Sequence, residues 1–211
     1  MRTARQHADP AGVPPVVVLV EGRSDVGAVA ALLGRAGIAA DSLVDVVDMG
    51  GVTNIRQQLH RFVQPGRARR IVGLCDEGET RYFVRALELH GLSVERAEDM
   101  AGYGFHVCRA DLEDELIRAL GTGVVLGVVD GLGLSRRFER FQDQEFWRGR
   151  DLHDQLHRFA GIASGRKSRF AAALAEAVAP DGVPTPLRAL VDHIHAALRT
   201  SGTPPLHRFA D

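Results

Sequence analysis

The stretch VVVLVEGRSD, residues 16–25, decides the fold. Its five apolar residues, bounded by Gly22, predict a strand that is buried on both faces. Apolar residues then recur at helical spacing, which predicts a helix that Ser24 caps and Asp25 opens. Two carboxylates, Glu21 and Asp25, are therefore expected at the carboxyl end of a central strand, where open α/β sheets bind their ligands.

The composition is that of an ordinary globular chain. It has 211 residues, 45% of them hydrophobic and 25% charged, enough for one large core and an appended subdomain. No apolar run reaches membrane-spanning length and residues 1–15 lack a signal peptide, so we expect a cytoplasmic protein without membrane contact. The net charge of −1 gives no global attraction to nucleic acid, so any such binding must rest on local patches.

The chain divides by composition into four parts. Residues 1–15, rich in Pro and Gly, are expected to form a flexible leader, and residues 201–211 a tail. Residues 16–121 alternate between predicted strands and helices, whereas residues 122–200 read as helical throughout. The alternation predicts a Rossmann-like α/β fold, with a mainly parallel sheet, helices on both faces and a helical C-terminal part.

Acidic residues follow three of the predicted strands. Glu21 ends the first, Asp76-Glu77-Gly78-Glu79 follows the strand 70–75, and Asp111-Leu112-Glu113 follows the strand 104–109. A single acid in the first turn of a helix is also what the helix dipole favours. Three such groups at one sheet edge would repel one another, which predicts that a divalent cation, Mg²⁺ first, lies between them.

Two further features bear on phosphate binding. Gly50 and Gly51, with Asn54, lie between a predicted strand and helix, where backbone amides can approach an anion, although a tight turn alone explains the pair. The absence of GxGxxG argues against a dinucleotide fold. Lys167 is the only lysine among 26 cationic side chains, which suggests a place that needs a compact ammonium group, and Arg166 and Arg169 flank it.

Two other pairs of residues are explained more simply by structural roles than by functional ones. His153 and His157 have the spacing of zinc ligands, but with no HExxH and no nearby Cys we expect a solvated or partly packed helix face. Phe146 and Trp147 are expected to anchor a polar loop to the core rather than to stack on a base.

In combination these motifs resemble a known family. Val20-Glu21-Gly22-Arg23-Ser24-Asp25, the Gly-Gly turn with Asn54, Leu74-Cys75-Asp76, Asp111-Leu112-Glu113 and the late Lys167 resemble, in order, the TOPRIM domain of the OLD (overcoming lysogenization defect) nucleases. The resemblance covers roughly residues 16–200 and implies the metal-binding α/β fold shared with topoisomerases and bacterial primases.

The resemblance also implies roles for individual residues. Glu21, Asp25, Asp76, Asp111 and Glu113 match acids that hold two divalent cations, Mg²⁺ or Mn²⁺, for phosphodiester cleavage, and Lys167 matches the basic residue beside the scissile phosphate. The family's second element is usually Asp-x-Asp, but here Gly78 takes the second acidic position, and Glu79, or else Glu77, is the substitute.

Several functions remain open at this point. The leading hypothesis is a metal-dependent DNA endonuclease or nickase, in phage defence or repair, with RNA as a further substrate class. The rivals are a nucleotidyl transferase, since primases share the fold, and a non-catalytic module that binds nucleic acid or an ATPase. OLD proteins carry an ATPase domain ahead of TOPRIM, and no GxxxxGK[ST] occurs here, so we expect a free-standing domain, with a separate ATPase subunit as one partner. The helical second half offers a surface for a homodimer.

Overall fold

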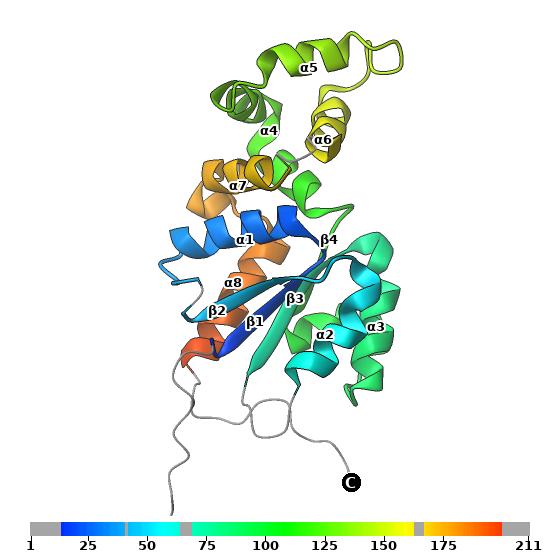
Figure 1. Cartoon of the computed structure of the whole chain (residues 1–211), viewed down its shortest axis with the longest axis vertical. Helices are drawn as coiled ribbons and strands as arrows, with labels where there is room; N and C mark the ends of the chain where they lie inside the picture. The colour runs from blue at the N-terminus through cyan, green and yellow to red at the C-terminus, as the bar shows by residue number, and fades with distance from the viewer. Residues whose placement is uncertain (1–13, 41, 64–68, 163–166, 200–211) are drawn as a thin grey trace, which may run out of the picture.

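The computed structural model describes residues 14–40, 42–63, 69–162 and 167–199 (Figure 1). The predicted leader, apart from residues 14 and 15, and the predicted tail lie outside this part of the chain.

A four-stranded parallel sheet forms the centre of the molecule. Its strands are β1 (Val16–Val20), β2 (Val44–Asp48), β3 (Arg70–Asp76) and β4 (Phe105–Cys108). They lie in the order β2-β1-β3-β4, and each neighbouring pair is parallel. This arrangement confirms the predicted α/β class, and it sets the carboxyl ends of all four strands at one edge.

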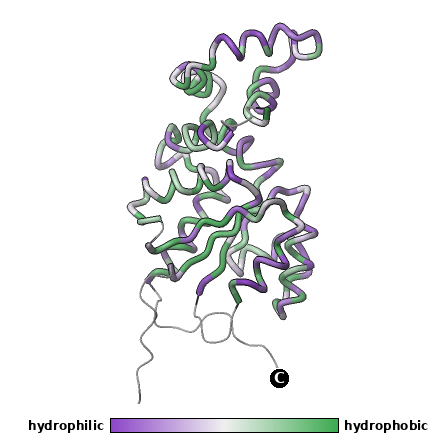
Figure 2. The backbone as a smooth tube through the Cα atoms, in the orientation of Figure 1, coloured by the Kyte–Doolittle hydropathy of each residue, from purple (hydrophilic) through white to green (hydrophobic). Residues whose placement is uncertain are grey.

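The central strand β1 is buried on both faces, as its sequence predicts. All five of its residues are 0% exposed. Val16, Val18 and Val20 belong to one hydrophobic cluster and Val17 and Leu19 to another, because side chains alternate across a strand. Figure 2 shows β1 as hydrophobic along its length. The two buried free cysteines, Cys75 and Cys108, are divided between the same clusters.

Helices cover both faces of the sheet (Figure 1). One face packs against α1 (Arg23–Arg35) and α8 (Thr185–Arg199), and the other against α2 (Ile55–Phe62) and α3 (Thr80–Leu89); α7 (Lys167–Ala177) packs against α1. Short 3₁₀ turns lie at Val52–Asn54, Glu77–Glu79, Ala97–Tyr103 and Pro180–Gly182.

The start of α1 differs from the sequence-based expectation. The N-cap position is taken by Gly22, not Ser24, and the helix begins at Arg23. Asp25 lies in the third helical position, where its Oδ2 accepts a hydrogen bond of 3.0 Å from the Gly22 amide. The prediction of a Ser24 cap was therefore wrong by two residues, because the carboxylate of Asp25 satisfies the helix start instead.

The remaining helices form an arm that projects beyond the sheet (Figure 1). Helix α4 (Leu112–Gly131) is kinked at Gly121, where φ is 71° and ψ is 154°, and α5 (Ser135–Gln142) and α6 (Leu152–Ile162) follow. Of the aromatic pair, Trp147 lies 5.0 Å from the Phe141 ring and is partly buried, whereas Phe146 is 63% exposed. Only Trp147 therefore anchors the loop.

In the described part of the chain, no helix combines the length and apolar character needed to cross a membrane.

Candidate metal centre

The predicted acids gather at the carboxyl edge of the sheet. Glu21 follows β1 directly, Asp76 is the last residue of the adjacent strand β3, and Asp111 and Glu113 lie at the start of α4, just after β4. The backbone amide of Asp76 donates a hydrogen bond of 3.1 Å to Glu21 Oε1, which joins the first two strand ends. Adjacent parallel strands thus bring acids that are far apart in the sequence into one place.

The electrostatics show how closely these carboxylates crowd one another. Burial, a hydrogen bond with Glu79 and the charges of Asp76 and Glu79 raise the pKa of Glu21 to about 8. Burial, followed by the charges of neighbouring acids, raises the pKa of Asp76 to about 8. Burial, then the charge of Glu113, raises the pKa of Asp25 to about 6. The acids whose charge acts on Asp76 are Asp25, Asp111, Glu113 and Glu79, so the six predicted metal ligands form one interacting group.

Glu79 lies where a substitute for the missing aspartate is needed. It is half-buried beside Glu21, and its Oε2 atom is buried without a hydrogen-bond partner in the described residues. Glu77 is instead exposed and lines a groove beside β4. Gly78 has open space where a Cβ would project. Of the two candidates, Glu79 is therefore the one whose side chain joins the acidic group.

Lys167 lies beside the third acidic element. Its Nζ atom is 3.6 Å from Glu113 Oε1; the Glu113 side chain is 5% exposed and that of Lys167 is 47% exposed. A close contact between α1 and α7 sets this position, because a Cβ on Gly27 would lie 2.7 Å from the Ser168 carbonyl oxygen. Asp25 and Lys167 therefore come from two helices that meet at a glycine. Arg169 is exposed on α7, and Arg166 lies outside the described residues.

The Gly-Gly turn is bonded to the acidic centre through its backbone. The Gly51 amide donates to the Glu21 carbonyl oxygen at 3.0 Å, and the Gly50 amide donates to Asp48 Oδ1 at 2.7 Å. Asn54 Nδ2 donates to the carbonyl oxygens of Met49 and Gly50 at 2.9 and 3.2 Å. The left-handed φ values of Gly50 and Gly51, 68° and 113°, make this turn possible. Both amides are engaged within the protein, so the turn orients the backbone of Glu21.

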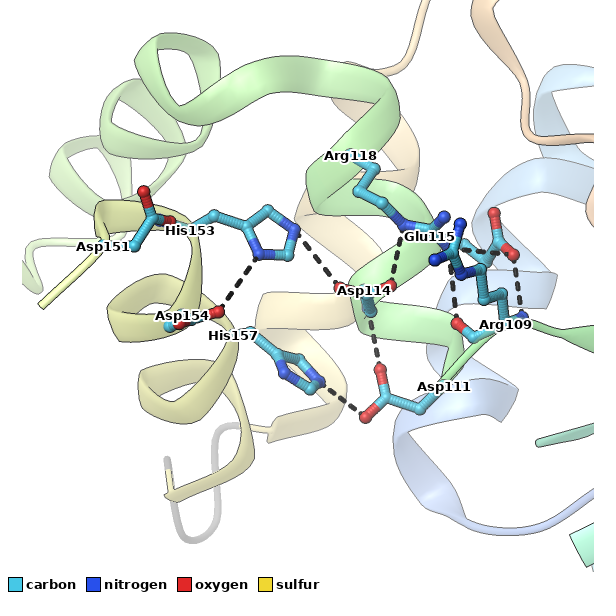
Figure 3. A network of polar contacts seen from close by, with 9 residues as sticks. All are labelled: Arg109, Asp111, Asp114, Glu115, Arg118, Asp151, His153, Asp154 and His157. Atoms are coloured by element: carbon cyan, nitrogen blue, oxygen red, sulfur yellow. Dashed lines mark hydrogen bonds and ion pairs between the residues drawn. The ribbon is translucent and has the colours of Figure 1, made fainter. Parts of the chain in front are cut away.

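Two histidines of the arm, His153 and His157, lie near the acidic centre. Their spacing in the sequence predicted a solvated or partly packed helix face. His157 Nε2 lies 2.7 Å from Asp111 Oδ2, and His153 Nε2 lies 3.2 Å from Asp114 Oδ1 (Figure 3). Asp114 also pairs with Arg118 Nε at 2.7 Å. The signal in the sequence was their i,i+4 spacing, but periodicity alone does not reveal which residues face them.

One group of side chains has the spacing of a preformed metal site, and it lies outside the predicted centre. Among the described residues, only Asp151, His153 and Asp154 bring three such ligand atoms within 4.8 Å of one another. Asp151 Oδ1 accepts the His153 amide at 2.8 Å at the start of α6, which explains that carboxylate as a helix cap. No three of the strand-end acids meet this spacing in the described chain.

The residues of the strand-end centre fit a hard divalent cation. Glu79 Oε2 is buried without a hydrogen-bond partner in the described chain, which is costly for a carboxylate, and Glu113 Oε1 has only the Lys167 ammonium at 3.6 Å. Burial first, and then the charges of neighbouring acids, raise the pKa values of Glu21 and Asp76, and a cation between the strands would offset both effects. An all-oxygen donor set is what Mg²⁺ and Mn²⁺ prefer.

The parallel sheet and its acidic edge define the chain as an α/β domain of the TOPRIM fold. The likeness to solved structures is more specific. The C-terminal region of the Xanthomonas campestris pv. campestris OLD protein is 26% identical, with a TM-score of 0.67, over 88% of this chain and 94% of that chain. The C-terminal region of the Burkholderia pseudomallei OLD protein is 22% identical, with a TM-score of 0.63, over 88% and 98%. No family model and no curated protein matches the sequence. The likeness confirms the resemblance to OLD proteins and supports a relationship to that nuclease family.

Proposed function

We propose that this protein cleaves phosphodiester bonds in nucleic acid, as a DNA endonuclease or nickase that depends on Mg²⁺ or Mn²⁺. One observation carries the proposal: carboxylates from three strand ends are gathered at one edge of the sheet, where burial first, and then the charges of neighbouring acids, raise the pKa values of Glu21 and Asp76 to about 8. A protein gains nothing in stability from such repulsion, so the arrangement serves the binding of cations.

The carboxylates of this centre are the proposed ligands of two cations. Glu21, Asp25, Asp76 and Glu113 are the proposed ligands, with Glu79 in place of the second aspartate and Asp111 at the edge of the group. When bound, paired cations supply an activated water and stabilise the leaving oxygen of a phosphodiester. The backbone turn at Gly51 and the Asp76 amide hold Glu21 in place from two sides.

Lys167 is the proposed stabiliser of negative charge at the scissile phosphate. Its ammonium group lies beside Glu113 but is about half exposed, so it can reach both the acidic centre and a bound phosphate. Arg166, Arg169 and the turn of Gly50, Gly51 and Asn54 remain predicted contacts for the nucleic-acid backbone. The Gly50 and Gly51 amides would have to release their present acceptors to bind a phosphate directly.

A second candidate is a non-catalytic module that binds nucleic acid or a separate ATPase subunit. Gly78 is the observation that favours it, because the second acidic element lacks its usual aspartate. Titration calorimetry separates the two: a module without cation sites would release no heat with millimolar Mg²⁺ or Mn²⁺.

The deciding experiment is a plasmid assay of the purified protein in Mg²⁺, Mn²⁺ and EDTA, with a single-stranded RNA assayed in parallel. We expect nicking or linearisation that requires metal and is lost in Lys167→Ala. Arg85→Ala, which removes an exposed cation from α3 on the other side of the sheet, is the control and should cleave like the wild type. Absence of cleavage in every metal would contradict the proposal and direct attention to the binding module.

A further inference from the structure

Helix α6 of the arm contacts the first turn of α4 through a histidine. His157 Nε2 lies 2.7 Å from Asp111 Oδ2, while Asp111 Oδ1 accepts the Asp114 amide at 2.8 Å (Figure 3). Both oxygens of Asp111 therefore have a fixed hydrogen-bond partner. A carboxylate oxygen carries two lone pairs, so each oxygen keeps one for a further ligand.

The partners of Asp111 fix the orientation of the segment that follows it. Asp111 is the N-cap residue of α4, and Glu113, with its buried oxygen lacking a hydrogen-bond partner, lies two residues further on. Because Asp111 Oδ1 accepts the Asp114 amide, a rotation of the Asp111 side chain would break this cap and loosen the first turn of α4, in which Glu113 lies. The contact with His157 resists that rotation from outside the helix.

We propose that His157 is a positioning residue for the cation centre: it orients Asp111, and through the start of α4 it orients Glu113. The inference rests on the proposed metal-dependent function. Asp111 Oδ2 is an acceptor, so His157 Nε2 carries the proton and donates it. Ligands of metal ions are commonly held by such hydrogen bonds from outside the coordination sphere.

The adjacent histidine on the same helix provides a natural comparison. His153 lies one turn before His157, and its Nε2 is 3.2 Å from Asp114 Oδ1. Asp114 is not a proposed ligand, and it retains Arg118 as a partner at 2.7 Å. Both histidines thus face the same turn of α4, but His153 Nε2 forms no hydrogen bond there within the described residues, and only His157 is hydrogen-bonded to a residue of the cation centre.

The test is Mn²⁺ affinity, measured by titration calorimetry on the full chain. His157→Leu should weaken binding about 10- to 100-fold, the usual effect of losing such a supporting hydrogen bond. His157→Gln, whose amide can donate from near the Nε2 position, should bind within about threefold of the wild type. His153→Leu, the matched control, should leave the affinity of the strand-end centre within about threefold, and any Mn²⁺ held by Asp151, His153 and Asp154 would be lost as a separate binding step.

Circular dichroism must show that each variant is folded. If His157→Leu does not fold, His157→Asn, whose shorter amide falls short of Asp111, takes its place. A long-range ¹H–¹⁵N spectrum of the wild type should show the proton of His157 on Nε2.

Three outcomes would overturn the inference. Equal affinity in His157→Leu and the wild type would remove the positioning role while leaving the proposed function intact. Equal losses in all three histidine variants would assign a purely structural role to the contact. No Mn²⁺ binding by the wild type would remove the proposed function together with the inference.

Discussion

The two sides of the acidic centre are held in opposite ways. On the sheet side, burial and neighbouring acids raise the pKa values of Glu21 and Asp76 to about 8. On the helix side, burial alone would raise the pKa of Asp111, but hydrogen bonds from His157 and the Asp114 amide bring it below its ordinary value. The sheet side thus lacks a positively charged partner among the described residues, whereas on the helix side Asp111 already has His157 as its partner.

This difference indicates what each side contributes. Asp111 is already stabilised as a carboxylate and forms part of the folded framework. Glu21 and Asp76 become fully charged at neutral pH only when a cation offsets their burial and the charges of the neighbouring acids. We infer that cation binding acts mainly on the sheet side. The predictions below test this comparison, from the largest expected effect to the smallest.

Glu21→Gln should abolish the function without weakening the fold. We expect metal-dependent plasmid cleavage to fall about a thousandfold, because a ligand to the cations is lost. The amide oxygen of Gln can still accept the Asp76 amide, and repulsion is removed, so the melting temperature in EDTA should not fall. Glu88→Gln, an exposed change on α3, is the control for both measurements. A Glu21→Gln variant that retains cleavage would contradict the assignment.

Asp111→Ala, unlike Glu21→Gln, should destabilise the metal-free fold. Loss of the helix cap and of the His157 contact should lower the free energy of unfolding by about 2 kcal/mol, measured by urea titration in EDTA. Asp111→Asn retains a good cap residue and should lose less. If Asp111→Ala were as stable as the wild type, the helix side would not be the structural half of the centre.

The melting temperature of the metal-free protein should fall as pH rises from 6.5 to 8. With pKa values of about 8, folded Glu21 and Asp76 hold protons that the unfolded chain, with carboxyl pKa values near 4, has released. The folded state binds more protons, so stability decreases with pH through this range. The raised pKa of His157 acts in the same direction. Burial lowers the pKa of His106 to about 4, so this residue acts in the opposite direction, mostly below pH 7, where the unfolded chain still holds the proton.

Calorimetric melting curves in EDTA and in Mg²⁺ measure this dependence. Mg²⁺ should remove most of the decrease in melting temperature between pH 6.5 and 8. Glu21→Gln should reduce this decrease by about half, because one of the two carboxyl groups with a raised pKa is gone. A melting temperature in EDTA that rises from pH 6.5 to 8 would show that the sheet side is not short of positive charge.

Gly78→Asp should raise the cation affinity of the sheet side slightly. Its Cβ position is open, so an aspartate fits without displacing a neighbour and restores the Asp-x-Asp pattern of the family. We expect Mn²⁺ affinity to rise only a few-fold, because Glu79 already occupies the acidic group. A gain of more than a hundredfold would mean that Glu79 contributes no ligand.

The sequence predicted the sheet side better than the helix side. The run Val16–Val20 and the acids after it are local signals, and parallel strands bring their carboxyl ends together without further information. The contact between His157 and Asp111 depends on how the arm folds back, which no periodicity encodes. The cap by Gly22 and the engaged amides of Gly50 and Gly51 were missed for a similar reason, since they depend on backbone geometry.

The contact of Gly27 with Ser168 fixes Lys167 relative to Asp25 without any contribution from α5 (Ser135–Gln142) or the loops that flank it. The segment between Asp25 and Lys167 includes α5 and its loops, which are far from this contact in the chain. Since α7 is seated directly on α1, helix α5 and its flanking loops can be lengthened, shortened or exchanged without moving the lysine relative to the aspartate. Helix α5 and its flanking loops are thus the part of the molecule in which new specificity can arise while the acidic centre, and the contact of His157 with Asp111, stay unchanged.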